Sequence, residues 1–125
     1  MTIRECYNEF GGDYAEVKNR LCSDNLIQRL IAKFPNDDSY CRLCRTIKEG
    51  NREEAFLAAH TLKGVSANLG FARLLDSADK LTELLRSSPY CIPDEADLLM
   101  ENVMGDYELT VAAIGRYVCS TSVKA

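Results

Sequence analysis

The residues best suited to chemistry lie in the segment 59–70. This segment contains His60, the only histidine of the 125-residue chain, followed by Lys63 and Gly64. A neutral imidazole is a nucleophile near pH 7, and Lys63 would place a cation beside an incoming phosphoryl group. Glycine inside a helix costs about 1 kcal/mol relative to alanine, but its missing side chain leaves space for another protein's backbone. The three residues predict a nucleophile that receives an anionic group from a protein partner.

Helical geometry predicts the direction in which His60 points. At about 100° per residue, Lys63 and Gly64 fall within about 60° of His60 on the helical wheel. The apolar residues of the same helix lie between about 140° and 260° from the histidine and form the stripe that should face the core. They are Ala55, Ala58, Ala59, Leu62, Val65 and Leu69. His60 is therefore predicted to face away from the core.

Apolar residues also surround His60 on the face that the core does not use. Phe56, Leu57 and Ala67 lie there, and an apolar surface beside a reactive group suggests a docking surface. Residues 55–75 contain Lys63 and Arg73 but no Asp or Glu, although the chain has a net charge of −4. A local positive patch would favour a partner with an acidic active site.

A family resemblance is carried by HTLKG at residues 60–64 and by SANLG at residues 66–70. These segments are similar to the signature of histidine-containing phosphotransfer (HPt) domains, which are four-helix bundles in multistep phosphorelays. The expected helix order and lengths agree with this family over residues 20–118.

The resemblance implies that His60 accepts a phosphoryl group from an aspartate of a receiver domain and passes it to another receiver. Lys63 would stabilise the phosphoryl group, and Gly64 would let the receiver dock. The implied partners are response-regulator receiver domains and hybrid sensor histidine kinases. The carboxylates of the partner should hold any Mg²⁺ that the transfer needs, and we expect no cofactor in this chain.

The chain departs from the family pattern at one position. Many HPt domains carry a glutamine or glutamate on the next helix, where it orients the second ring nitrogen of the histidine. Thr82 or Glu83 stands there in this chain, and the hydroxyl of Thr82 is a candidate for the orienting role. Arg86, one turn further, is either a second cation near the docking face or a plain solvated arginine.

Two rival functions belong to other classes. One is an interaction module that binds receivers through the same surface but has lost phosphotransfer. The other is a metal-dependent bundle enzyme, which would need Glu-x-x-His pairs on inward-facing helices. The residue three before His60 is Leu57, which argues against that enzyme. The chain also lacks a Gly-rich nucleotide loop, so a carrier without autonomous kinase activity is expected.

Apolar residues at three- and four-residue spacing predict an all-α fold: an antiparallel four-helix bundle with additional short N-terminal helices. We expect one HPt-like domain over residues 1–125, with the bundle core at about 24–118. The expected helices span 2–10, 13–21, 24–34, 38–49, 51–69, 72–87 and 93–118. In the last helix, Pro93 is the expected first residue. Its expected buried residues are Leu99, Val103, Tyr107, Val111, Ile114 and Val118.

The cysteines and the composition bound the remaining possibilities. Of the six cysteines, only Cys41 and Cys44 are close together; buried free thiols are the favoured interpretation, and a metal or redox site is the alternative. The acidic balance argues against nucleic-acid binding. No apolar stretch is long enough to span a membrane, and the N-terminus lacks the pattern of a secretory signal. We therefore expect a cytoplasmic protein. As a phosphotransfer carrier it is expected to be a monomer.

Overall fold

The computed structural model describes residues 1–120, which form seven α-helices and one short 3₁₀ helix, without strands. The helices are α1 (Ile3–Glu9), α2 (Tyr14–Leu21), α3 (Asp24–Lys33), η1 (Phe34–Asn36), α4 (Ser39–Glu49), α5 (Arg52–Leu69), α6 (Ala72–Arg86) and α7 (Ala96–Ser120). The predicted all-α fold is confirmed. Within the described residues, no helix is long and apolar enough to cross a membrane.

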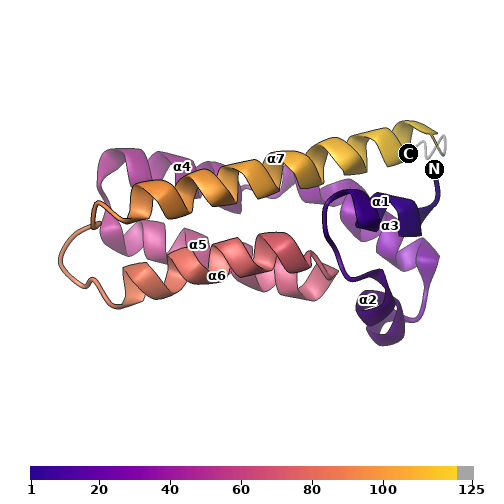
Figure 1. The fold of residues 1–125 in the computed structure, drawn as a ribbon, viewed down its shortest axis with the longest axis horizontal. Helices are drawn as coiled ribbons and strands as arrows, with labels where there is room; N and C mark the ends of the chain where they lie inside the picture. Colours follow the sequence, from indigo (N-terminus) through magenta and orange to yellow (C-terminus); the bar gives the residue numbers. More distant parts are fainter. Residues whose placement is uncertain (121–125) are drawn as a thin grey trace.

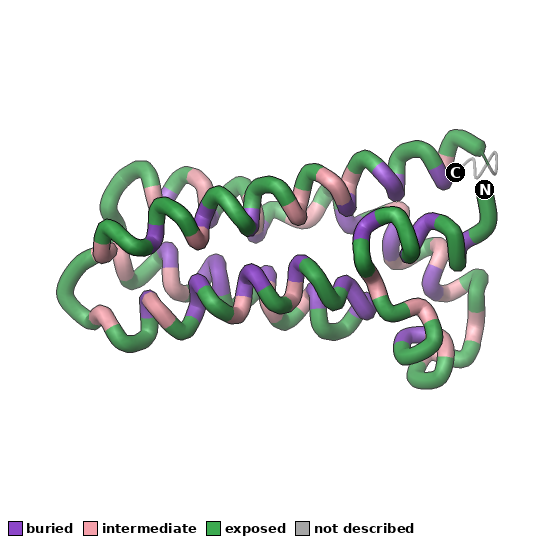
Figure 2. The backbone as a smooth tube through the Cα atoms, in the orientation of Figure 1, coloured by how far each residue is buried: buried purple, intermediate pink, exposed green. Residues whose placement is uncertain are grey.

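The four longest helices carry the architecture. Figure 1 shows α4, α5, α6 and α7 lying side by side along the longest axis, with α1, α2 and α3 gathered at one end. The α5 helix packs against both α4 and α6, and α6 packs against α7. The buried residues of the bundle lie where these helices meet (Figure 2). The helix that carries His60 is therefore held on two sides by its neighbours in sequence.

Local capping signals set the ends of the helices. The side chains of Asp13, Ser23 and Asn51 each accept a hydrogen bond from a backbone N–H three residues later, which satisfies a donor that the helix leaves free. At the other end, Gly50 and Gly70 adopt left-handed conformations with φ of 70° and 71°. Glycine adopts this conformation without a steric penalty, so α4 and α5 end at these residues.

The last helix differs from its prediction in two respects. It begins at Ala96 rather than at Pro93, because residues 93–97 first form turns in which Ala96 donates to the Pro93 carbonyl and Asp97 to the Asp94 carbonyl. Its buried face is also rotated relative to the expected one. The buried residues are Ala96, Met100, Val103, Thr110, Ala113, Ile114 and Tyr117. The predicted stripe was drawn through bulky apolar residues alone, whereas the buried face also includes Ala96, Ala113 and Thr110.

An aromatic cluster closes the end of the bundle at which α1, α2 and α3 gather. The ring centroids of Tyr7 and Phe10 are 4.9 Å apart, and those of Phe10 and Phe71 are 5.1 Å apart. Phe34 lies 4.9 Å from Phe71 in an edge-to-face arrangement. Aromatic pairs of this kind add to the stability that comes from burial itself. The cluster joins α1 and η1 to the turn between α5 and α6.

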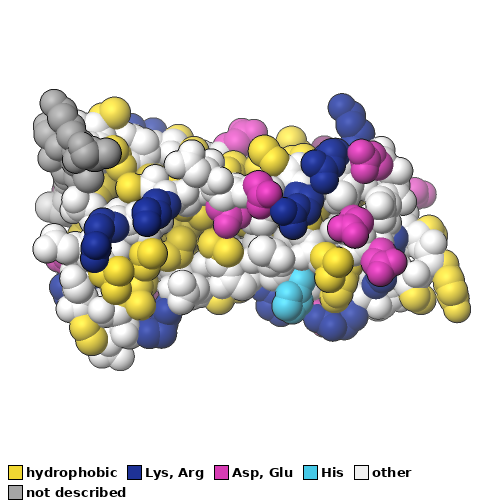
Figure 3. Space-filling model, turned by 180° about the vertical axis from the view of Figure 1, so that it is seen from behind, with side chains coloured by type: hydrophobic (Ala, Val, Ile, Leu, Met, Phe, Trp, Pro, Cys, Tyr) yellow, Lys and Arg dark blue, Asp and Glu magenta, His cyan; other side chains and the backbone are white. Residues whose placement is uncertain are grey.

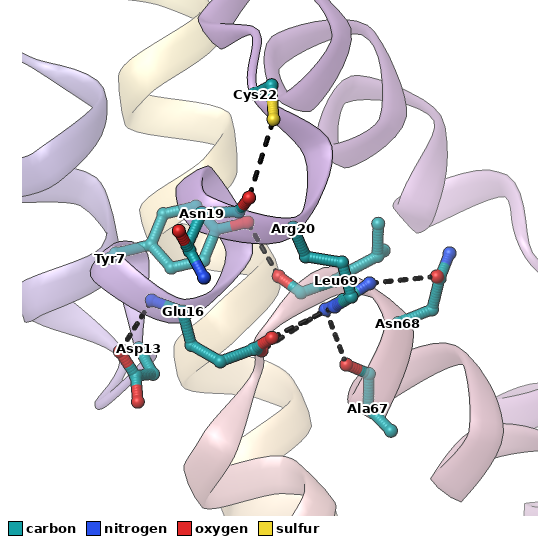
Figure 4. A network of polar contacts seen from close by, with 9 residues as sticks. All are labelled: Tyr7, Asp13, Glu16, Asn19, Arg20, Cys22, Ala67, Asn68 and Leu69. Atoms are coloured by element: carbon teal, nitrogen blue, oxygen red, sulfur yellow. Dashed lines mark hydrogen bonds and ion pairs between the residues drawn. The ribbon is translucent and has the colours of Figure 1, made fainter.

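Polar contacts from the N-terminal segment also hold the end of α5 (Figure 4). The Arg20 guanidinium donates to the Ala67 carbonyl at 3.1 Å and to the Asn68 side-chain oxygen at 3.2 Å. The Asp13 N–H donates to the Gly70 carbonyl at 2.8 Å. A helix leaves its last carbonyls without partners, so residues 13–20 supply the donors that the end of α5 lacks.

The cysteines lie mostly on the surface, contrary to the expectation of buried thiols. Only Cys6 is buried, and Cys44 is half-buried. The exposed thiols are Cys22, Cys41, Cys91 and Cys119. All six are free, and residues 1–120 contain no group of three or more His, Cys, Asp or Glu side chains that could hold a metal ion.

Candidate functional site

His60 lies at the surface in the middle of α5, as the helical wheel predicts (Figure 3). Ala55, Ala58, Ala59, Leu62 and Leu69 are buried on the opposite side of the helix. Val65, which was expected to be buried, is only half-buried, whereas its neighbour Ser66 is buried. Within the described part of the chain, no hydrogen bond involves the imidazole. Neither ring nitrogen therefore has a hydrogen-bond partner among residues 1–120.

Gly64 and Ala67 continue the exposed face of α5 beyond His60. Both are exposed. A Cβ atom added at Gly64 would meet no heavy atom of the described residues within 4 Å outside the local helix backbone. Among the described residues, Gly64 thus does not serve close helix–helix packing. The space beside it is open to solvent.

Phe56 lies one turn before His60, with its ring centroid 6.0 Å from that of the imidazole. The guanidinium carbons of Arg52 and Arg86 lie 5.2 Å and 5.1 Å from the phenyl centroid. Guanidinium groups at such distances are attracted to the electron-rich face of an aromatic ring. Phe56 is consequently half-buried rather than fully exposed, while Leu57 beside it is 50% exposed.

The two arginines on Phe56 differ in their freedom to move. Both Nε and one terminal nitrogen of Arg52 donate to the Leu85 carbonyl, which fixes the guanidinium at the end of α6. Arg86 forms a 3.0 Å ion pair with Glu83, and both side chains are about half exposed. An exposed pair of this kind contributes little stability, so Arg86 can exchange partners. It lies at the edge of the predicted docking surface.

Lys63 points toward α6, where its Nζ lies 2.8 Å from a carboxylate oxygen of Asp79. The prediction of a positive patch considered only residues 55–75 and therefore missed this carboxylate. The charge of Lys63 is paired in this state, so the patch is less positive than expected. The cation remains within one turn of His60 along α5.

Thr82 and Glu83 have partners other than His60. Thr82 is fully buried, and its hydroxyl donates to the Ala78 carbonyl at 2.7 Å. Glu83 faces Arg86. The expected role of Thr82 in orienting the imidazole therefore has no hydrogen bond to support it across residues 1–120.

The sequence analysis missed two residues that contact the candidate site, Arg52 and Asp79. The spacing of four residues between Arg52 and Phe56 is the usual spacing of side-chain pairs on one helix face and was a usable signal. Asp79 gave no comparable signal, because its contact with Lys63 joins two helices.

Comparisons with known proteins agree with this arrangement. The family model of the Hpt domain matches residues 23–106, which is more than half of the chain and includes His60 and the helices around it. Searches of curated proteins and of solved structures gave no match. Hpt domains act in phosphotransfer within two-component signalling and interact with receiver domains and kinases. On the strength of the family match, this chain belongs to the Hpt domain family.

Proposed function

We propose that this chain is a histidine phosphotransfer carrier, in which His60 accepts a phosphoryl group from a receiver-domain aspartate and passes it to another receiver. The observation that carries the proposal is the exposed imidazole, which has no hydrogen-bond partner among the described residues and lies beside the open space at Gly64. The proposed unit is a monomer in which residues 1–125 form one domain.

The reaction needs only a nucleophile from this chain. A lone pair of an imidazole nitrogen forms a bond to phosphorus while the bond between phosphorus and the aspartyl oxygen breaks. The electron pair of the broken bond returns to the aspartate as a carboxylate. The next receiver reverses these steps with its own aspartate as nucleophile. Lys63 lies close enough along α5 to approach the transferred group once it leaves Asp79.

The docking surface in this proposal comprises Phe56, Leu57, Gly64, Ala67 and Arg86. Its centre is apolar or lacks side chains, and Arg86 adds a cation at its edge. Partner surfaces commonly combine an apolar centre with a polar rim, and arginine is enriched in them. Two guanidinium groups lie against the Phe56 ring, so little side-chain entropy is lost when a partner covers it.

One observation favours a second candidate, a receiver-binding module without phosphotransfer. Thr82 gives its hydroxyl hydrogen to Ala78, and within residues 1–120 no side chain orients the imidazole through a hydrogen bond. A freely rotating imidazole would attack phosphorus less efficiently, because orientation supplies a large part of catalysis. Binding to receivers would be unaffected.

The deciding experiment uses purified protein and receiver domains phosphorylated on aspartate by a small phosphodonor with Mg²⁺. We expect a label on this chain that is labile to acid and stable to alkali, as phosphohistidine is. His60→Gln should abolish the label while circular dichroism and receiver binding stay unchanged. Binding without label across several receivers would support the second candidate, and a label that survives His60→Gln would refute His60 as the acceptor.

A further inference from the structure

Asp79 is the nearest charged partner of Lys63 in this structure. The 2.8 Å ion pair joins α5 to α6 and holds the ammonium group toward α6. The same cation is the one that should approach a phosphoryl group on His60, one turn earlier on α5. Two anions, the Asp79 carboxylate and the phosphoryl group on His60, would therefore compete for the ammonium group of Lys63.

We propose that Asp79 is a positioning residue that competes with the phosphoryl group on His60 for Lys63. This inference rests on the proposed function. Before transfer, Asp79 binds Lys63 away from the imidazole. When a phosphoryl group bonds to an imidazole nitrogen, Lys63 leaves the carboxylate and pairs with the phosphoryl oxygens, and Asp79 becomes solvated. When the phosphoryl group leaves, the original ion pair forms again.

The exposure of the pair allows this exchange. The Lys63 and Asp79 side chains are 32% and 45% exposed, so water can solvate either partner when the pair separates. Lysine carries its charge as a compact ammonium on a flexible stem. The pair borders an open hollow of about 440 Å³, which is also lined by Ala72, Leu75 and Asp76. Water in this hollow can therefore solvate Asp79 when Lys63 leaves it.

The relative strength of the two anions gives the exchange its direction. A phosphoryl group carries more charge than a carboxylate and offers three strong acceptor oxygens. The ammonium group forms charge-assisted hydrogen bonds to either anion, so the larger charge of the phosphoryl group makes its pair with Lys63 the stronger one. Asp79 therefore reduces the fraction of molecules in which Lys63 is free to pair with the phosphoryl group, but it does not prevent that pairing.

The test compares Asp79→Asn with the wild type, using phosphoramidate as the phosphodonor. In this reaction the imidazole nitrogen bonds to phosphorus as the phosphorus–nitrogen bond of the donor breaks and ammonia leaves, so no receiver is needed. We expect Asp79→Asn to raise the rate of labelling of His60 about two- to fivefold, the size of an exposed ion-pair effect. In a Lys63→Ala background, the same substitution should leave the rate unchanged.

Asp76→Asn is the matched control. Asp76 lies one turn before Asp79 on α6, lines the same hollow and forms a 2.9 Å ion pair with Lys80 instead of Lys63. The substitution Asp76→Asn removes the same negative charge. An equal rate increase from Asp76→Asn would therefore indicate that the loss of any nearby negative charge is sufficient, and it would overturn the proposal. An unchanged or lower rate for Asp79→Asn would show that the pair is only a brace between helices. A rate increase from Asp79→Asn that persists in the Lys63→Ala background would lead to the same conclusion.

The design separates this proposal from the proposed function. Labelling by phosphoramidate with no labelling by any phosphorylated receiver would refute the carrier function alone, and the comparison of variants would still decide the role of Asp79. A wild-type His60 that phosphoramidate fails to label would overturn the competition as well, because no phosphoryl group would then reach the site.

Discussion

The phenolic hydroxyl of Tyr7 donates a 2.7 Å hydrogen bond to the carbonyl oxygen of Leu69, and both residues are buried. Tyr7 belongs to α1, outside the residues that match the family model, whereas Leu69 ends the helix that carries His60. Together with the contacts of Arg20 and Asp13, this bond makes residues 1–22 part of the support of α5. The N-terminal helices therefore contribute to the rigidity of the candidate site.

Replacing Tyr7 with phenylalanine should destabilise the protein. The substitution removes the hydroxyl but leaves the Leu69 carbonyl buried, and an unpaired buried acceptor costs about 1–3 kcal/mol. We expect the free energy of unfolding in urea at pH 7 to fall by about 1–2 kcal/mol. Identical unfolding curves for the two proteins would show that water replaces the lost donor.

The same variant should reveal a pH dependence. Burial raises the pKa of the Tyr7 hydroxyl well above its usual range, with the nearby Cys6 adding to the rise. Because the folded pKa exceeds the unfolded value of about 10, the stabilisation is complete below pH 10 and falls as the pH rises beyond it. The stability difference between wild type and Tyr7→Phe should therefore shrink above pH 10. A difference that stays constant between pH 7 and 11 would contradict the assignment.

Substitutions at Gly64 should separate stability from docking. Alanine is favoured over glycine in a helix by about 0.5–1 kcal/mol, and a Cβ at Gly64 meets no heavy atom of residues 1–120 within 4 Å outside the local helix backbone. Gly64→Ala should therefore raise the melting temperature. Gly64→Gln should weaken binding to a receiver domain about tenfold or more through obstruction, which isothermal titration can measure; tenfold corresponds to about 1.4 kcal/mol.

Gly105 provides the matched control for Gly64. It lies in α7, is exposed, and also has open space around its Cβ position. Gly105→Ala should stabilise the protein similarly, and Gly105→Gln should leave receiver affinity unchanged. Equal losses of affinity from both glutamine variants would remove Gly64 from the docking surface.

The six thiols should react at different rates. Burial raises the pKa of the Cys6 thiol to about 11, and the thiolate is the reactive form. With a disulfide reagent at pH 8, the exposed Cys22, Cys41, Cys91 and Cys119 should be modified first. Cys6 should be modified only after denaturant is added. Mass spectrometry of the peptides identifies each modified cysteine, and early modification of Cys6 would show that α1 opens readily.

Much of the candidate site could be predicted from the sequence, because the decisive patterns are local. The outward direction of His60 depends only on its angular distance from Ala55, Ala59 and Leu62 within one helix. The start of α5 at Asn51 and its end at Gly70 depend on capping chemistry within a few residues. Such relations hold within a single helix, whatever the helix packs against.

The tertiary structure decided which residues of different helices meet. The pair of Lys63 with Asp79, the placement of Arg86 over Phe56, and the bond from Tyr7 to Leu69 each depend on how two elements are rotated and shifted along their axes. The burial of Thr82 and the rotated face of α7 have the same origin. Packing of side chains across the whole core sets these rotations, so no periodicity within one helix specifies them.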